Sequence, residues 1–208
     1  MKYILMLTIM ISSTFAQINL GNPIYIRIFK EEKILELWIK EYARYTLYKS
    51  YPIQKTSGLL GPKQEEGDKQ NPEGIYAIAK KDLNPHSHYF LSMNIGYPNR
   101  LDRNLKRTGS AIMIHGGCKS IGCFAMGDAG IQEIYDFAQN ALDRGQHYFY
   151  VAIFPFKMTD KNLNRYKETP WFPFWKNLQE GYQLFNHERY PSKVTVKGSR
   201  YVFKANFK

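Results

Sequence analysis

The sequence predicts a β-rich α+β fold, and three patterns support this. Residues 24–30 alternate in the manner of a strand, and residues 34–39 form a second apolar run after a short charged turn. Residues 129–144 instead space their apolar side chains three and four positions apart, which is typical of an amphipathic helix. The chain has 208 residues, 44% of them hydrophobic, which is enough for one domain with a proper core.

The amino terminus has the pattern of a secretory signal peptide at residues 1–16. Lys2 supplies the positive charge, an apolar run follows, and Ala16 ends a cleavage site of small residues. The apolar run is too short to span a membrane comfortably, although an uncleaved anchor is the alternative. We therefore expect a periplasmic protein with no stable transmembrane anchor and a single catalytic domain over residues 17–208.

The remaining elements follow from local patterns. A loop rich in Gly, Pro, Lys and Glu covers residues 54–72 and is either a solvated surface loop or part of a substrate site. Aromatic side chains crowd residues 169–188, where packing on the sheet is favoured over lining a groove. Further strands are expected at 42–51, 75–78, 90–95, 111–114 and 147–156, and a hairpin at 193–204.

The helix over 129–144 has both of its end signals. Asp128 follows Gly127 as an N-cap, and Gly145 is the stop signal. Cys123 lies five positions before this cap, so we expect the positive end of the helix to lower the pKa of its thiol.

The chemistry concentrates between residues 112 and 126. His115 follows an apolar strand and Cys123 lies directly after a glycine, so a base and a thiol nucleophile are eight positions apart. A Cys118–Cys123 disulfide, or inert packing of the two sulfurs, is the main alternative. The spacing of His115 and the two cysteines lacks the paired Cys-x2-Cys of ordinary zinc sites, which disfavours a metal.

The net charge of the chain limits the kinds of binding partner that are expected. The chain carries 29 basic and 18 acidic residues, a net charge of +11, which suits an anionic partner. No nucleic-acid module is recognisable, so nucleic acid is not expected, and many of the lysines form a solvated face. His86 and His88 share a face of an extended segment without further ligands, which favours a surface role.

Several separated blocks resemble one enzyme family. The blocks are NPEGIY at 71–76, YPN at 97–99, RTGSAIMIHG at 107–116, SIGCFAM at 120–126 and IFPFKM at 153–158. They resemble the YkuD-type L,D-transpeptidases, and their wording is similar to the YafK-like subgroup. The resemblance implies a mixed β-sandwich with peripheral helices. It also implies a thiol enzyme that acts on the stem peptides of peptidoglycan without a metal or cofactor.

The resemblance also implies catalytic roles. Cys123 attacks a peptide carbonyl at the diamino acid and forms a thioacyl-enzyme, while His115 serves as the base. N–H groups at Gly122 and Cys123, helped by Ser120 or Gly116, stabilise the oxyanion.

Substrate contacts and the acceptor follow from the same resemblance. Contacts with the stem peptide are expected from Gly116, Tyr97, Arg107 and Ile121. Ile121 stands where the mainstream family has a second histidine, and Ala125 stands where it has Arg or Asn. These departures match the YafK-like subgroup, which is similar to enzymes that release peptidoglycan-linked lipoprotein. Either hydrolysis or transfer therefore remains open, and a silent peptidoglycan-binding protein with a Cys118–Cys123 disulfide is the rival hypothesis.

Overall fold

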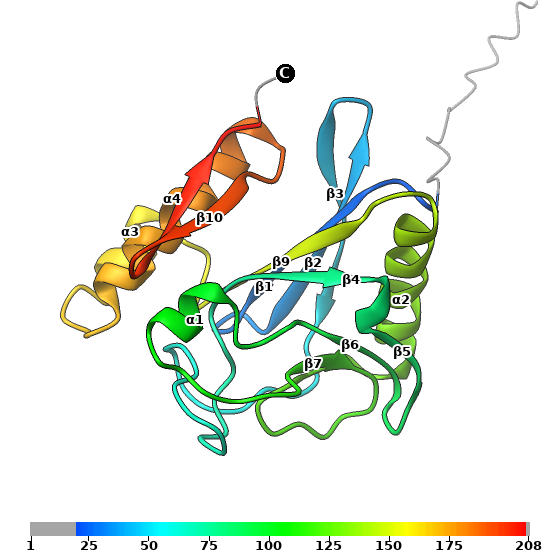
Figure 1. Ribbon diagram of the computed structural model, residues 1–208, viewed down its shortest axis with the longest axis horizontal. Coiled ribbons are helices and arrows are strands. Elements are labelled where there is room, and N and C mark those ends of the chain that lie inside the picture. Colours follow the sequence, from blue (N-terminus) through cyan, green and yellow to red (C-terminus); the bar gives the residue numbers. More distant parts are fainter. Residues whose placement is uncertain (1–19, 207–208) are drawn as a thin grey trace, which may run out of the picture.

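The computed structural model describes residues 20–206, so the predicted signal peptide lies outside the described residues. A five-stranded sheet, a four-stranded sheet, a two-stranded sheet and two long helices make up most of this part of the chain (Figure 1). The larger sheet has the strand order β3-β2-β1-β9-β4. Its strands are β1 (Ile24–Phe29), β2 (Ile34–Glu41), β3 (Arg44–Pro52), β4 (Gly74–Ala79) and β9 (Tyr148–Phe154). Strand β1 runs antiparallel to β2 and parallel to β9, so the sheet is mixed.

The four-stranded sheet contains His115, one of the predicted site residues. Its order is β5-β6-β7-β8. The strands are β5 (Leu83–Ser87), β6 (Phe90–Asn94), β7 (Met113–His115) and β8 (Phe124–Ala125). The short helix η1 (Lys80–Asp82) directly precedes β5, and α1 (Arg100–Asn104) lies between β6 and β7 in sequence.

A hydrophobic core lies between the two sheets and is closed by helix α2 (Asp128–Asp143). The side chains at alternate positions of β1, Ile24, Ile26 and Ile28, point into it. Helix α2 contributes its apolar stripe, which includes Ile131. The helix predicted at 129–144 is thus confirmed, because its local periodicity matches the face that it buries.

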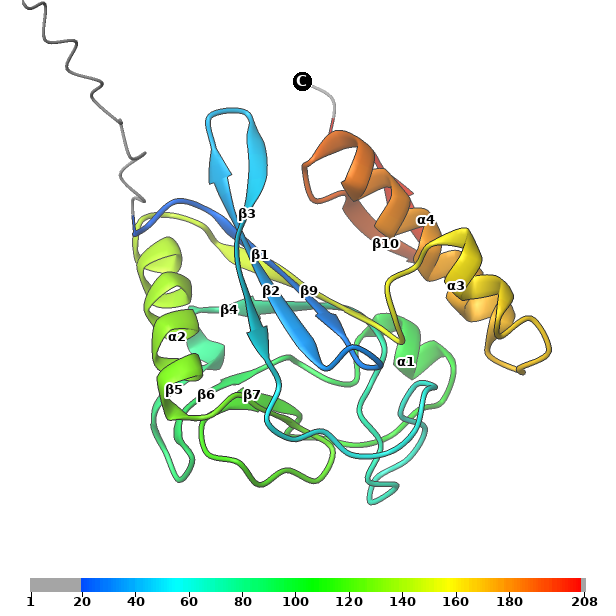
Figure 2. The ribbon, with the colours of Figure 1, turned by 180° about the vertical axis from the view of Figure 1, so that it is seen from behind.

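The opposite face of the large sheet is also covered. Helices α3 (Asp160–Asn164) and α4 (Phe172–Glu188) and the hairpin of β10 (Lys193–Lys197) and β11 (Arg200–Lys204) pack there. Seen from behind, this layer and the small sheet lie on opposite sides of β1, β2 and β9 (Figure 2). Trp175, Tyr182 and Phe185 of α4 are buried, so the predicted packing of the aromatic segment is confirmed.

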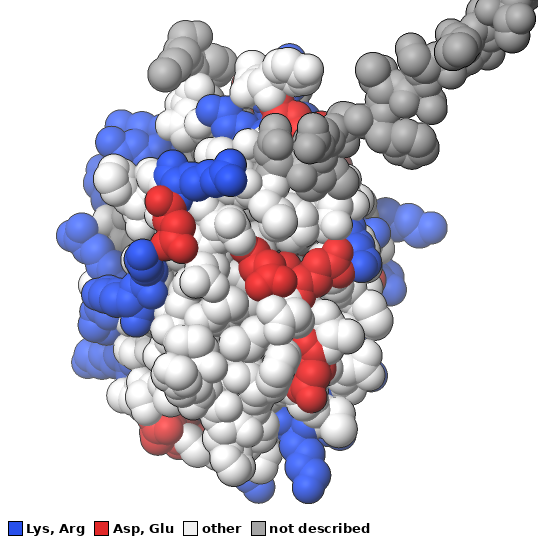
Figure 3. Space-filling view, turned by 90° about the vertical axis from the view of Figure 1, so that its right-hand side faces the viewer, with Lys and Arg blue, Asp and Glu red and all other residues white. Residues whose placement is uncertain are grey.

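The predicted β-rich α+β class and the sandwich-like arrangement are both confirmed. Basic side chains are unevenly spread over the surface. On the side where α2 lies, Lys and Arg gather mainly along one edge, while Asp and Glu form small separate groups (Figure 3). His86 and His88 are exposed.

Candidate active site

The predicted base, His115, ends strand β7, and the predicted nucleophile, Cys123, lies directly before the neighbouring strand β8. The strands are parallel, with Ile114 opposite Phe124 and His115 opposite Ala125. Ile114 and Phe124 are fully buried in the core between the sheets. Cys123 directly precedes β8, two positions before Ala125, and its sulfur accepts from the Met113 N–H of β7. Because side chains alternate along an extended chain, we infer that the thiol is directed to the side of the small sheet on which His115 lies.

The His115 ring is held in one tautomer. Its Nδ1 lies 2.6 Å from the carbonyl oxygen of Gly116, so Nδ1 carries the proton and Nε2 is left as the acceptor. The ring of Tyr89 packs against it at a centroid distance of 4.6 Å. Burial lowers the pKa of His115, and the Gly116 carbonyl opposes this only in part. A neutral imidazole with a free Nε2 is the form that accepts a proton.

Cys123 is half-buried and its sulfur is placed by two backbone groups. Met113 N–H donates to Sγ at 3.4 Å, and Sγ–H donates to the Ala111 carbonyl at 3.6 Å. Burial raises the pKa of the thiol, while the Met113 N–H and the charge of Lys63 lower it by less. The expected lowering of this pKa by helix α2 is therefore wrong, because desolvation dominates. The resting group is a thiol that needs a base.

Asp128 contributes differently from its predicted capping role. Helix α2 begins at Asp128 and its N-cap is Gly127, which has no side chain to cap the helix. The Asp128 carboxylate instead accepts the N–H of Gly117 at 2.7 Å. It thereby fastens the loop that connects His115 to Cys123.

The long segment 54–72 forms part of the site, which the sequence left open. Gly122 N–H donates to Ser57 Oγ at 2.6 Å, and Asn71 Nδ2 donates to the Cys123 carbonyl at 2.8 Å. Ser57 and Asn71 were missed as site residues because they lie 65 and 52 positions from their partners. The NPEGIY block was their only signal in the sequence, and it marks Asn71 alone.

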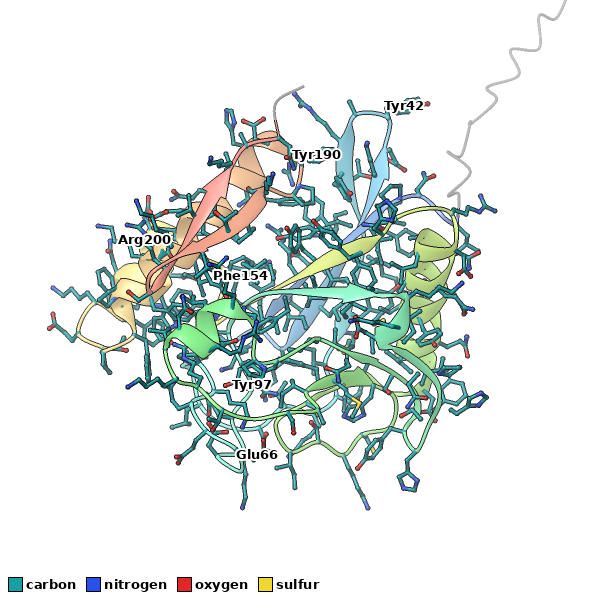
Figure 4. All side chains as sticks on the ribbon, in the orientation of Figure 1. Tyr42, Glu66, Tyr97, Phe154, Tyr190 and Arg200 are labelled. Carbon is teal, nitrogen blue, oxygen red and sulfur yellow. The ribbon has the colours of Figure 1, made fainter. Side chains whose placement is uncertain are left out.

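A pocket of about 400 Å³ lies beside the cysteine. It is lined by Ala111, whose carbonyl accepts from the Cys123 thiol, and by Gly122. Ile121 also lines it and is 73% exposed, in keeping with a substrate contact. The rest of the lining is Lys63, Glu66, Gly67, Lys69, Ser110 and Ile112. Glu66 lies at the lower margin of the molecule in the view of Figure 4.

The predicted oxyanion groups are placed as follows. Gly122 N–H, the expected donor, is already donated to Ser57. Ser120 Oγ is buried and has no hydrogen-bond partner among residues 20–206, so its hydroxyl is available. Gly116 is buried, and its N–H donates to the Leu91 carbonyl at 3.1 Å.

Two predicted substrate contacts point into the protein instead. Tyr97 is 5% exposed, and its hydroxyl donates to the carbonyls of Lys63 and Thr108 (Figure 4). Arg107 forms a buried ion pair with Asp102 at 2.9 Å. Neither side chain lines the pocket beside Cys123.

Both cysteines are free, and Cys118 is exposed, so the Cys118–Cys123 disulfide of the rival hypothesis is not present in the structure. Within residues 20–206, no cluster of three or more His, Cys, Asp or Glu side chains is arranged to hold a metal ion. No helix of this described part is long and apolar enough to cross a membrane.

Comparison with known proteins finds relatives that are similar in sequence and others that are similar in fold. The chain is 46% identical over 192 residues to "Putative L,D-transpeptidase YafK" of Escherichia coli K12, a match that covers 92% of this chain and 78% of that protein. Two crystal structures of the helical cell shape determining protein Pgp2 from Campylobacter jejuni share the fold. A point mutant gives a TM-score of 0.53 at 19% identity, covering 86% of this chain and 73% of that chain. The other structure gives 0.52 at 19% identity, covering 84% and 73%.

Residues 23–168, which include every strand of both sheets and the His115–Cys123 pair, match the YkuD family, the L,D-transpeptidase catalytic domain. This match spans well over half of the chain, and the relative in E. coli agrees with it. The chain therefore belongs to the YkuD family of L,D-transpeptidase catalytic domains.

Proposed function

We propose that this protein is a periplasmic, cysteine-dependent enzyme that cleaves a peptide bond in peptidoglycan stem peptides at the diamino acid. The observation that carries the proposal is the contact of the Cys123 sulfur with the Met113 N–H of β7, two residues before His115, next to a pocket lined by Ala111 and Gly122. Family membership supports peptidoglycan as the substrate. The net charge of +11 suits stem peptides, which carry free carboxylates.

The geometry supports an acyl-enzyme route. His115 Nε2 takes the proton of the Cys123 thiol as sulfur attacks the carbonyl carbon, and the electron pair moves to the carbonyl oxygen. When the tetrahedral species collapses, the C–N bond breaks and the imidazolium returns its proton to the leaving amine. Ser120 Oγ–H is the free donor for the oxyanion. Water or a second amine then attacks the thioester through the same imidazole.

No hydrogen bond joins Cys123 and His115 among residues 20–206. In an unliganded site, catalytic hydrogen bonds are commonly long and shorten when substrate binds. The shared face of the sheet is what makes that approach possible. Stem peptides that carry covalently linked lipoprotein fit the same chemistry, because their linkage is also to the diamino acid.

The test is to incubate the purified mature protein with peptidoglycan sacculi and to analyse the muropeptides by mass spectrometry. Trimmed stems or a released lipoprotein remnant would identify a hydrolase, and new cross-links between diamino acids would identify a transferase. We expect Cys123→Ala to abolish either product. If reduced wild-type protein gives the same muropeptides as Cys123→Ala, the proposal is wrong and a binding role replaces it.

A further inference from the structure

A closed ring of hydrogen bonds surrounds the peptide between Gly122 and Cys123. Gly122 N–H donates to Ser57 Oγ at 2.6 Å, and the Cys123 carbonyl accepts from Asn71 Nδ2 at 2.8 Å. Ser57 N–H donates to Asn71 Oδ1 at 2.9 Å and completes the ring. The ring therefore holds the backbone on both sides of the nucleophile.

Further bonds fix the two side chains that form the ring. The Ser57 hydroxyl donates to the Lys69 carbonyl at 2.7 Å, so its one proton is committed and its lone pair faces Gly122. Asn71 is fully buried, and its backbone carbonyl accepts from Lys30 Nζ at 3.0 Å. Its side-chain oxygen and nitrogen are both used within the ring, so each side chain enters the ring in a single orientation.

The turn at Gly122 and Cys123 has few interactions of its own that fix its conformation. Gly122 has a φ of +86°, a left-handed conformation that a glycine leaves easily. Among residues 20–206, the hydrogen bonds of the Cys123 sulfur are two long ones, with Met113 N–H and the Ala111 carbonyl. A restraint from outside the turn is therefore needed to keep sulfur on the His115 face.

We propose that Ser57 and Asn71 are positioning residues, which clamp the Gly122–Cys123 peptide so that the sulfur stays buried against Met113 and level with His115. Neither side chain touches the substrate in this role. The proposal rests on the proposed function only for its consequence on turnover. It makes these two side chains, rather than segment 54–72 as a whole, a working part of the active site.

Release of the clamp has two opposite consequences. Burial is the largest cause of the raised pKa of Cys123, and the Met113 contact only partly offsets it. A loosened turn exposes the sulfur, so its pKa falls and more thiolate is present at neutral pH. The same loosening moves sulfur away from His115, so catalysis falls. A small alkylating reagent then reacts faster while the natural reaction slows.

The experiment compares Ser57→Ala and Asn71→Ala with wild-type protein. Alkylation of Cys123 by iodoacetamide is followed from pH 6 to pH 10 by peptide mass spectrometry, since trypsin cleavage at Lys119 separates Cys118 from Cys123. We expect the midpoint to move to lower pH and the reaction at pH 7 to become several-fold faster, because a larger fraction of the sulfur is then thiolate. Turnover of sacculi should fall by about 10- to 100-fold, as misplacement of a reacting group by about 1 Å does.

Two control variants separate positioning from general loosening. Ser57→Thr keeps the hydroxyl and should restore both readouts. Gln70→Ala removes hydrogen bonds to Leu59 and Gly61 within the same segment but none to the cysteine turn, so it should leave both readouts unchanged. Circular dichroism confirms that each variant is folded.

The outcomes are distinct. The proposal fails if Ser57→Ala and Asn71→Ala alkylate as the wild type does, or if Gln70→Ala shifts the midpoint equally. If wild-type protein leaves sacculi unaltered, the proposed function fails, and the alkylation profiles alone decide whether the clamp exists. A lowered midpoint with rescue by Ser57→Thr supports the clamp in either case.

Discussion

His115 and Cys123 are both uncharged in the resting site, and burial is the main cause for each. It lowers the pKa of the imidazole and raises the pKa of the thiol. The two pKa values therefore move apart, and the pH range over which imidazole and thiol are both neutral is wider than for the free side chains. This favours proton transfer during attack over a preformed thiolate–imidazolium pair.

The directions of these two pKa shifts predict how turnover and alkylation depend on pH. On the acid side, activity falls as His115 becomes protonated, and the lowered pKa places this limb below about pH 6.5, the usual value for histidine. On the alkaline side, alkylation of Cys123 should still rise above about pH 8.5, the usual value for a free thiol. Initial rates and iodoacetamide labelling across pH measure the two limbs. A labelling midpoint below neutral pH would instead indicate a preformed ion pair.

At the scale of elements, the loop from His115 to Cys123 depends on two glycines for different reasons. A Cβ on Gly116 would lie 2.5 Å from the Tyr89 carbonyl oxygen and 2.7 Å from the Asp128 carboxylate. A Cβ on Gly122 meets nothing closer than 3.5 Å, so only its positive φ opposes a side chain. Gly116 is required because a side chain has no space there, and Gly122 is required because its backbone has a positive φ.

The two substitutions should therefore differ in severity. Gly122→Ala should cost roughly 1–2 kcal/mol, the usual penalty of a left-handed conformation. Gly116→Ala should cost more, because backbone must move and the carbonyl that holds the His115 ring moves with it. Urea denaturation measures both free energies of unfolding, and turnover should fall further in Gly116→Ala. Equal stability of Gly116→Ala and wild type would contradict this account.

Local patterns were sufficient for the longer strands and for helix α2, but they did not predict α1, α3 or the two-residue strand β8. Strands β1 and β9 and helix α2 were predictable because their periodicity is contained within each segment. The Asn99-x-x-Asp102 capping box was also a local signal: it places Asp102 at the start of α1, where it pairs with Arg107. Read that way, the sequence could have indicated an inward orientation for Arg107.

The site was only half predictable. The family motifs drew attention to His115 at the end of β7 and to Cys123 just before β8, but the bonds of Ser57 and Asn71 join residues more than fifty positions apart. Those pairings depend on how the large sheet and the small sheet stack, and no local spacing encodes it. The burial that sets the pKa values of the reacting groups has the same origin.

At the scale of the whole molecule, Glu73 joins three parts that are distant in sequence. Its fully buried carboxylate accepts from Lys30 Nζ at 2.9 Å, Gly61 N–H at 2.8 Å and Trp175 Nε1 at 2.6 Å. These groups belong to the turn after β1, to segment 54–72 and to helix α4. Lys30 also donates to the Asn71 carbonyl, so the same group of bonds reaches the clamp beside Cys123.

Glu73→Gln tests this connection, because it keeps the shape of the side chain and removes its charge. Lys30 is then buried without a counter-ion, and loss of one partner from a buried pair costs about 3–5 kcal/mol. Asp143→Asn is the matched control, since it breaks the exposed Lys80–Asp143 pair at 2.7 Å and should cost less than about 1 kcal/mol. Denaturant unfolding measures both. Lys30 bonds both Glu73 and the Asn71 carbonyl, so Glu73→Gln should also loosen Asn71 and speed alkylation of Cys123. If Glu73→Gln and wild-type protein are alkylated at the same rate, the carboxylate stabilises the fold without restraining the cysteine turn.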